Sequence, residues 1–170
     1  MESGFRTNKT RQIAFAAAIA AAYTALTLAF APISSGLIQC RISEALCVLP
    51  WYFPAAVPGL TLGCLLSNLL TGAPLPDIIF GTFATFLAAK IICIMRDWRP
   101  GRFLIPLPPV ICNGLIVGAL LVHVYGVGVP YLLAAFYVAI GEALACYGIG
   151  LPLLFFLEKR CAGMIAKLRD

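Results

Sequence analysis

Long uncharged stretches alternate with short charged or proline-rich breaks along the chain. No charge falls within 13–31, 45–76 or 103–141, and each run approaches or exceeds the roughly 20 residues that a membrane-spanning helix needs. Pro50, Pro54 and Pro58 divide the second run, because proline disfavours a continuing helix and restricts the residue before it. The pattern predicts six helices, at about 13–31, 43–53, 55–70, 76–95, 103–125 and 130–157.

The first run has a second interpretation. Residues 29–31 (AFA) fit the small-x-small pattern of a signal-peptide cleavage site. The run is long for the apolar core of a signal peptide, which favours a span that is kept.

Basic residues predict the topology. Lys and Arg collect on the cytoplasmic side of membrane proteins, and here they cluster before residue 13, within 96–102 and after residue 158. Three spans are needed between the first outer loop and Arg96, since one span cannot absorb 43–95. Six spans with both termini cytoplasmic then place every basic residue inside except Arg41 and Lys90, and Lys90 lies near an inner helix end where it can snorkel.

Composition narrows the class further. The chain has 170 residues, 62% hydrophobic and 11% charged, and a mean hydropathy of +0.98. These values exclude a soluble globular protein, a disordered chain and a nucleic-acid binder. We therefore expect an all-α membrane protein, with residues 1–170 forming a single integral membrane domain. The net charge of +5 fits its topology better than an acidic partner.

The seven cysteines do not suggest a metal or disulfide framework. Their number is odd, no CxxC occurs, and most lie inside apolar runs, where cysteine is a small buried hydrophobe. His123 is the single histidine, so zinc chemistry of the HExxH type is absent and no metal site is expected.

Polar side chains inside apolar runs are the candidates for function, because each is costly in a bilayer. The expected topology places nearly all of them in the outer half of the membrane or near its midplane, as in a pocket that opens outward. Asn113 and Glu142 fall at similar depth in an antiparallel hairpin, about 16–18 Å below its turn at 1.5 Å per residue. The set comprises Gln39, Arg41, Glu44, Asn68, Asp77, Lys90, Asn113, His123 and Glu142.

Each candidate also has a structural interpretation. Arg41 and Glu44 are spaced for a helix-end ion pair. Asp77 follows a proline at a helix start and could cap it. Asn68 could bond a neighbouring helix, and His123 could be a wet surface residue. A mid-membrane Glu142 is harder to explain structurally, because it needs a partner or a proton.

The first helix carries a stripe of small residues. Ala14, Ala18 and Ala22 recur every four residues, a spacing that lets another helix approach closely. The partner is either another helix of this chain or a second membrane protein that docks on a flat face.

Three motifs together resemble the QueT family. They are residues 38–46 (IQCRISEAL), residues 58–64 (PGLTLGC) with Asn68, and residues 77–85 (DIIFGTFAT). Their order and spacing are more specific than any one of them, and the resemblance runs from the first helix to Glu142. QueT proteins are substrate-binding S-components of energy-coupling factor (ECF) transporters, linked to import of queuosine precursors.

The resemblance implies a fold and partners. It implies an ECF S-component-like bundle in the bacterial cell membrane that binds its ligand from outside and docks on a T-component and two cytoplasmic ATPases. In that class an alanine motif on the first helix contacts the T-component, which matches Ala14, Ala18 and Ala22. The chain lacks a GxxxxGK[ST] loop. It is therefore expected to be no enzyme and to need no cofactor, the ATP being used by its partners.

A 7-deazaguanine ligand suits the polar set. A carboxylate reads the N1–H and exocyclic amine donors, and Asn, Gln or Arg reads the O6 acceptor. We expect Glu142 and Asn113 at the ring and Asp77 with Asn68 nearer the mouth, while a second carboxylate, with Glu44 also a candidate, could balance a 7-aminomethyl cation. Gln39 and Arg41 could close over the ligand as a lid. Aromatic residues that could stack on the base, or else be ordinary core, are Phe80, Phe83, Phe136 and Tyr137.

Three rival functions stay open. The polar set also fits an S-component for a flavin or thiamin. An intramembrane enzyme would need reactive groups at one depth, and Cys112 beside Asn113, with His123 three turns away, is the only suggestive arrangement. A purely structural membrane subunit is the third, and a buried Glu142 speaks against it.

Overall fold

The computed structural model describes residues 9–33, 40–98 and 101–169, with side chains described up to residue 160. Within these ranges every regular element is helical. They are α1 (Lys9–Ala29), η1 (Ala31–Ile33), η2 (Ile42–Trp51), α2 (Ala56–Leu70), η3 (Asp77–Gly81), α3 (Thr82–Trp98), η4 (Arg102–Leu104), α4 (Leu107–His123), α5 (Tyr131–Ala145), η5 (Cys146–Gly150) and α6 (Leu151–Arg169).

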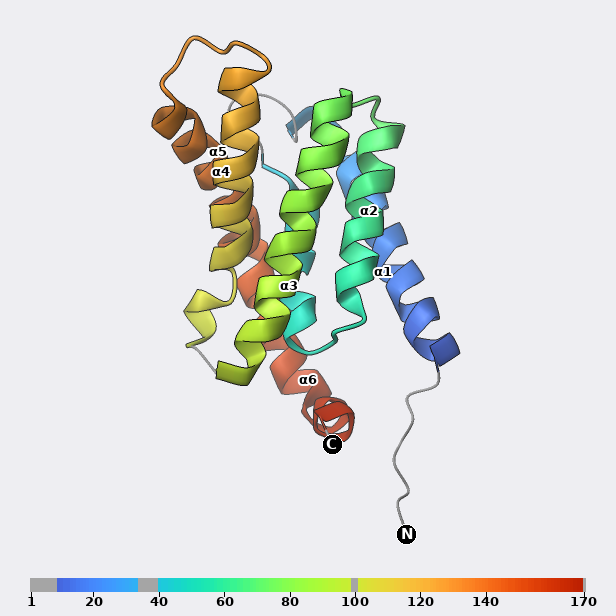
Figure 1. Cartoon of the computed structure of the whole chain (residues 1–170). Coiled ribbons are helices and arrows are strands. Elements are labelled where there is room, and N and C mark those ends of the chain that lie inside the picture. Colours follow the sequence, from blue (N-terminus) through green and yellow to red (C-terminus); the bar gives the residue numbers. More distant parts are fainter. Residues whose placement is uncertain (1–8, 34–39, 99–100, 170) are drawn as a thin grey trace.

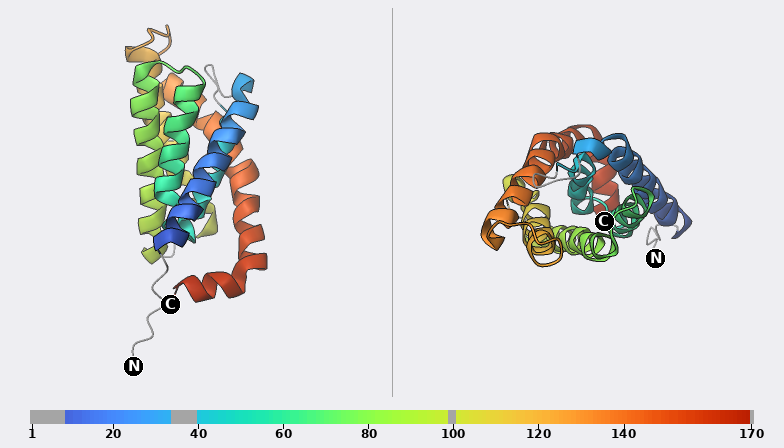
Figure 2. Two further views of the ribbon diagram at one scale, coloured as in Figure 1. Left: turned by 90° about the vertical axis from the view of Figure 1, so that its right-hand side faces the viewer. Right: turned by 90° about the horizontal axis from the view of Figure 1, so that it is seen from above.

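The helices form a bundle around η2. Seen along the bundle, η2 lies inside a ring made by the other helices (Figure 2), and it packs against α1, α2, α3, α5, η5 and α6. The start of α1 and the end of α6 lie at the same end of the molecule (Figure 1). The number of membrane crossings and the side on which the termini lie stay predictions from the sequence.

The polarity of the molecule is reversed relative to a soluble protein. Large apolar side chains such as Leu62, Phe83, Leu132 and Leu144 are at least half exposed, whereas Glu44, Asn68, Asn113 and Glu142 are at most 3% exposed. An apolar exterior of this extent matches a lipid environment, and buried polar groups then have to find partners inside.

Glycines allow two helix pairs to approach closely. A Cβ on Gly59 would lie 2.6 Å from the carbonyl oxygen of Ala16, and one on Gly118 would lie 2.6 Å from the Cα of Ala135. Small residues of this kind are typical of helix contacts in membranes. They fasten α1 to α2 and α4 to α5.

The six predicted helical segments are found, but not all as full spans. Four helices are long and apolar enough to cross a membrane: Lys9–Ala29, Asp77–Trp98, Arg102–His123 and Tyr131–Arg160. The segments Ile42–Trp51 and Ala56–Leu70 are shorter. The predicted division of this run into two helices is confirmed, since η2 ends at Trp51 and α2 begins at Ala56. Of the three prolines only Pro54 lies in the break, while Pro50 lies inside η2 and Pro58 in the first turn of α2.

Some helix types and boundaries differ from the prediction. The segment expected at 43–53 is a 3₁₀ helix rather than an α-helix. The helix expected from Phe103 begins as an α-helix only at Leu107, with prolines at its first positions, where proline is tolerated. Short π-helical segments, η3 and η5, interrupt the regular pattern at Asp77–Gly81 and Cys146–Gly150.

Candidate substrate-binding site

Glu44 is the most completely bonded polar residue of the interior. It lies on η2 and is 0% exposed. Its Oε1 accepts hydrogen bonds from the hydroxyl of Tyr23 on α1 and from Oγ1 of Thr85 on α3 at 2.8 Å. Its Oε2 accepts from the thiol of Cys47 at 2.8 Å. One carboxylate therefore joins α1, η2 and α3 at the centre of the bundle.

Arg41 lies immediately before η2 and reaches into the same interior. Its guanidinium lies beside Gly81, next to Asn68. A Cβ added to this glycine would be 3.8 Å from Nη1 of Arg41 and 3.4 Å from Nδ2 of Asn68. The guanidinium is within electrostatic reach of Glu44 and Glu142. Among the side chains described, no ion pair within 4.0 Å joins Arg41 to Glu44, so the simple helix-end pair expected as an alternative is not formed.

Asn113 on α4 and Glu142 on α5 are buried, at 1% and 2% exposure. Nδ2 of Asn113 and Oε2 of Glu142 have no hydrogen-bond partner among the described residues. The contact of Gly118 with Ala135, and of Gly114 with Ala139, sets the antiparallel register that places Asn113 and Glu142 at similar depth. The structure thus agrees with the depth predicted for this pair, and unsatisfied buried polar atoms call for an explanation.

Asn68 and Asp77 form a second part of the site, where the end of α2 meets the start of η3. The Asn68 amide donates to the backbone oxygen of Asp77 at 3.3 Å and lies 3.6 Å from Sγ of Cys64. The alternative in which Asn68 bonds a neighbouring helix is therefore realised. Asp77 is the first residue of η3 rather than its N-cap, a position that Pro76 occupies without a side-chain capping hydrogen bond. Burial raises the pKa of the Tyr125 hydroxyl, and a hydrogen bond to Asp77 and the negative charge of Asp77 add to this shift, which brings the pKa to about 12.

Other predicted residues lie outside this cluster. Phe80 is 48% exposed and Phe136 is 59% exposed, on the outer surface, and Tyr137 is half-buried. Gln39 lies outside the described residues. Cys112 is buried and His123 is exposed eleven residues further along α4, about 16 Å at helical rise. That distance does not bring the two together as reactive partners.

The stripe of small residues on α1 faces away from the bundle. Ala14, Ala18 and Ala22 are exposed, while the opposite face of α1 buries Ile19 and Tyr23 against the core. The contacts of α1 with α2 are made by the buried face instead. The interpretation in which this stripe packs within the chain is therefore wrong for these three residues.

Sequence reasoning missed several residues of the interior. Sequence analysis predicted none of four residues that surround Glu44 and Asn68 as part of the site, although two of them end the motifs at 58–64 and 77–85: Tyr23, Cys47, Cys64 and Thr85. Their signal was weak, because single hydroxyls and thiols are common in apolar helices. Gly81 could have been noticed as a small residue inside the DIIFGTFAT motif.

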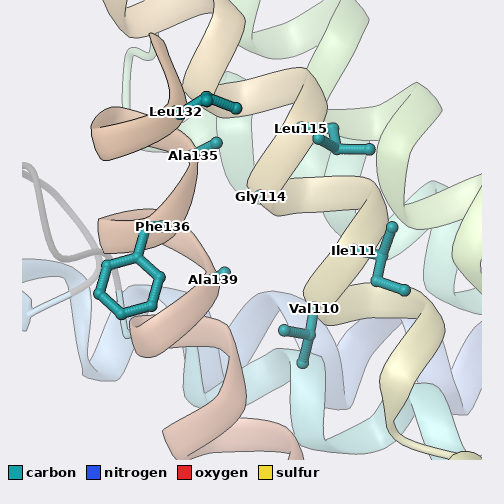
Figure 3. A pocket seen from close by; sticks show the side chains of 8 residues that line it. All are labelled: Val110, Ile111, Gly114, Leu115, Leu132, Ala135, Phe136 and Ala139. Carbon is teal, nitrogen blue, oxygen red and sulfur yellow. The ribbon is translucent and has the colours of Figure 1, made fainter. Parts of the chain in front are cut away.

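A separate groove lies on the outer surface between α4 and α5. It measures about 260 Å³, and its lining is apolar, from Val110, Ile111 and Leu115 on α4 to Leu132 and Phe136 on α5 (Figure 3). It shares no residue with the buried polar cluster. Within the described residues no group of three or more His, Cys, Asp and Glu side chains could hold a metal ion.

Comparison with known families decides the assignment. A family described as QueT transporter matches residues 13–159 of this chain. The chain belongs to the QueT transporter family. The match covers all the residues of the polar cluster, and with four helices long enough to span a bilayer it makes the chain a membrane transport protein. Neither the curated proteins nor the solved structures gave a match.

Proposed function

We propose that this chain is the substrate-binding component of an ECF-type importer and captures a 7-deazaguanine queuosine precursor, such as 7-aminomethyl-7-deazaguanine or queuine, from outside the cell. Membership of the QueT transporter family supports the transport role. The observation that carries the site is the buried pair Asn113 and Glu142, whose polar atoms Nδ2 and Oε2 lack a partner within the described chain. A ligand with complementary donors and acceptors would satisfy both.

The base edge of a 7-deazaguanine matches this pair. The carboxylate of Glu142 accepts hydrogen bonds from N1–H and the exocyclic amine, and the amide of Asn113 donates to O6. Nδ2 is a donor, so the unpartnered atom of Asn113 has the polarity that a carbonyl oxygen requires. Arg41, Asn68 and Asp77 would then border the ligand toward the mouth. Of the predicted stacking residues, the half-buried Tyr137 is left as a candidate, since Phe80 and Phe136 lie on the outer surface.

Energy for uptake would come from partners. We infer docking on a T-component and two ATPases through the exposed face of Ala14, Ala18 and Ala22. The small side chains would let a helix of the partner approach the backbone of α1.

Ligand depletion by the purified full-length protein in detergent tests the proposal. A 7-deazaguanine panel, riboflavin and thiamin are presented side by side. Saturable binding of a 7-deazaguanine alone is the expected result. Binding of riboflavin or thiamin instead would replace the cargo, and binding of none by folded protein would overturn the substrate-binding role.

A further inference from the structure

Helix α3 carries a lysine on an apolar face that lies away from the bundle interior. Phe83, Phe86, Lys90 and Ile94 follow one another at spacings of three or four residues, which places them on one side of the helix. The three apolar side chains are at least 40% exposed, and Lys90 is exposed among them. The opposite side of α3, which includes Ala88, is buried. A charge thus lies within a surface that otherwise suits a lipid environment.

The depth of Lys90 makes this charge costly. Helix α3 ends at Trp98, which is 78% exposed, and tryptophan is enriched at the membrane–water interface. Lys90 precedes it by eight residues, about 12 Å at helical rise, and a lysine side chain covers only about half of that length. Snorkelling therefore brings the ammonium nearer to the interface without reaching it. Among the described side chains no carboxylate lies within 4.0 Å of Lys90.

The surface around Lys90 is continuous with the exposed face of α1. Helices α1, α2 and α3 follow one another around the bundle (Figure 2), and α2 packs against both of the others. The outer side of α2 exposes Leu62, Leu66 and Leu69, and α1 exposes its alanine stripe. One apolar surface therefore runs from the stripe across α2 to the face that holds Lys90.

We propose that Lys90 forms an ion pair with a carboxylate on a membrane helix of the T-component, so that the docking surface extends from the alanine stripe of α1 across α2 to α3. The inference rests on the proposed function and adds a named contact to its partner surface. Ionisable side chains within a membrane are almost always paired, and this chain offers Lys90 no partner among its described residues. A charge pair inside an apolar interface also fixes the register of the two proteins and disfavours wrong partners.

Three substitutions at Lys90 test the proposal in the full-length protein. Lys90→Met keeps the length of the side chain and removes the charge, Lys90→Glu reverses the charge, and Lys90→Arg keeps it. The apparent Kd for a purified module of T-component and two ATPases is measured in detergent, together with ligand binding by each variant alone. We expect ligand binding to stay unchanged in all three. We expect docking to weaken at least about tenfold in Lys90→Met, to weaken further in Lys90→Glu, and to be largely kept in Lys90→Arg.

Lys159→Met is the matched control, because Lys159 is an exposed lysine on α6 rather than on this surface, and it should dock like wild type. Unchanged docking of Lys90→Met would overturn the proposal, even if Lys90→Glu docks poorly, since the ammonium would then have no partner to lose. Weaker docking of Lys90→Met in phospholipid vesicles but not in detergent would assign the ammonium to lipid phosphates and would also overturn it. Failure of the wild-type protein to dock would instead overturn the proposed function, and this inference with it.

Discussion

At the scale of single residues, the buried polar side chains differ in how fully they are hydrogen bonded. Glu44 has hydrogen-bond donors from three elements, while Nδ2 of Asn113 and Oε2 of Glu142 have no partner among the residues that the structure describes. A fully bonded carboxylate stabilises one arrangement of helices, and a carboxylate oxygen without a partner in the chain is available to a ligand. We therefore propose that Glu44 organises the site and that Glu142 contacts the ligand.

Tyr23 tests the organising role of Glu44. Tyr23→Phe removes a buried donor to a carboxylate and should lower the stability by about 1–3 kcal/mol, seen as a lower melting temperature in detergent. Tyr131→Phe is the matched control, because that hydroxyl is exposed and bonds only the backbone oxygen of Leu115 at 3.2 Å. Equal melting temperatures for both variants would contradict a structural role for the Tyr23–Glu44 bond.

The sequence predicted the burial and shared depth of Asn113 and Glu142 better than it predicted the hydrogen bonds around Glu44. Asn113 and Glu142 were identifiable because a charged or amide group in a long apolar run is costly, and their shared depth followed from helical rise. The donors around Glu44 were not identifiable. Hydroxyls and thiols cost little in a helix, and their convergence depends on how α1, η2 and α3 pack.

At the scale of elements, η2 explains how ten residues can pass through the centre of the bundle. A 3₁₀ helix rises about 2.0 Å per residue against 1.5 Å for an α-helix. Ile42–Trp51 therefore spans about 20 Å rather than about 15 Å. Hydropathy and prolines predicted a helix here, but the sequence did not indicate its 3₁₀ form, because contacts with surrounding helices decide it.

The α4–α5 contact gives a test of helix packing. Gly118→Ala would place a methyl group 2.6 Å from the Cα of Ala135. The backbone of Ala135 cannot move aside as the end of a flexible side chain can. We therefore expect the free energy of unfolding to fall by about 1–3 kcal/mol and the melting temperature to fall by several degrees. Gly148→Ala is the control, since a Cβ there meets nothing within 4 Å. Similar melting temperatures for the two variants would show that this close approach is absent.

Helix α1 has two different faces. Its inner face bonds the site through Tyr23, and its outer face exposes the alanine stripe. Ala18→Trp should leave ligand binding unchanged and reduce ATP-driven uptake in reconstituted vesicles to below about a tenth, a change of about 1.4 kcal/mol or more in docking. Leu144→Trp, at a position 60% exposed on α5, is the control. Full uptake by the Ala18 variant would exclude this face as the docking surface.

At the scale of the whole molecule, an apolar exterior encloses a polar interior. The start of α1 and the end of α6 share one end of the bundle (Figure 1), and the last part of α6 turns across that end (Figure 2). Composition was enough to predict the helical class, while the number of crossings and the cytoplasmic termini, argued from charge clusters, stay predictions. Span lengths were not predictable in the same way. The short η2 packs against six other elements and need not satisfy a bilayer on its own, whereas α2 is short although several of its leucines are exposed.

Binding of 7-aminomethyl-7-deazaguanine by the wild-type protein and by Glu142→Gln tests the central claim most directly. Glu158→Gln is the control. This partly exposed carboxylate lies away from the site and forms an ion pair with Arg102, with 2.6 Å between Oε1 and Nη2. We predict saturable binding to wild type and Glu158→Gln, and a loss of about tenfold or more in Glu142→Gln, from one hydrogen bond to a charged group. Undiminished affinity in a folded Glu142→Gln would contradict the placement of the ligand at Glu142 and Asn113.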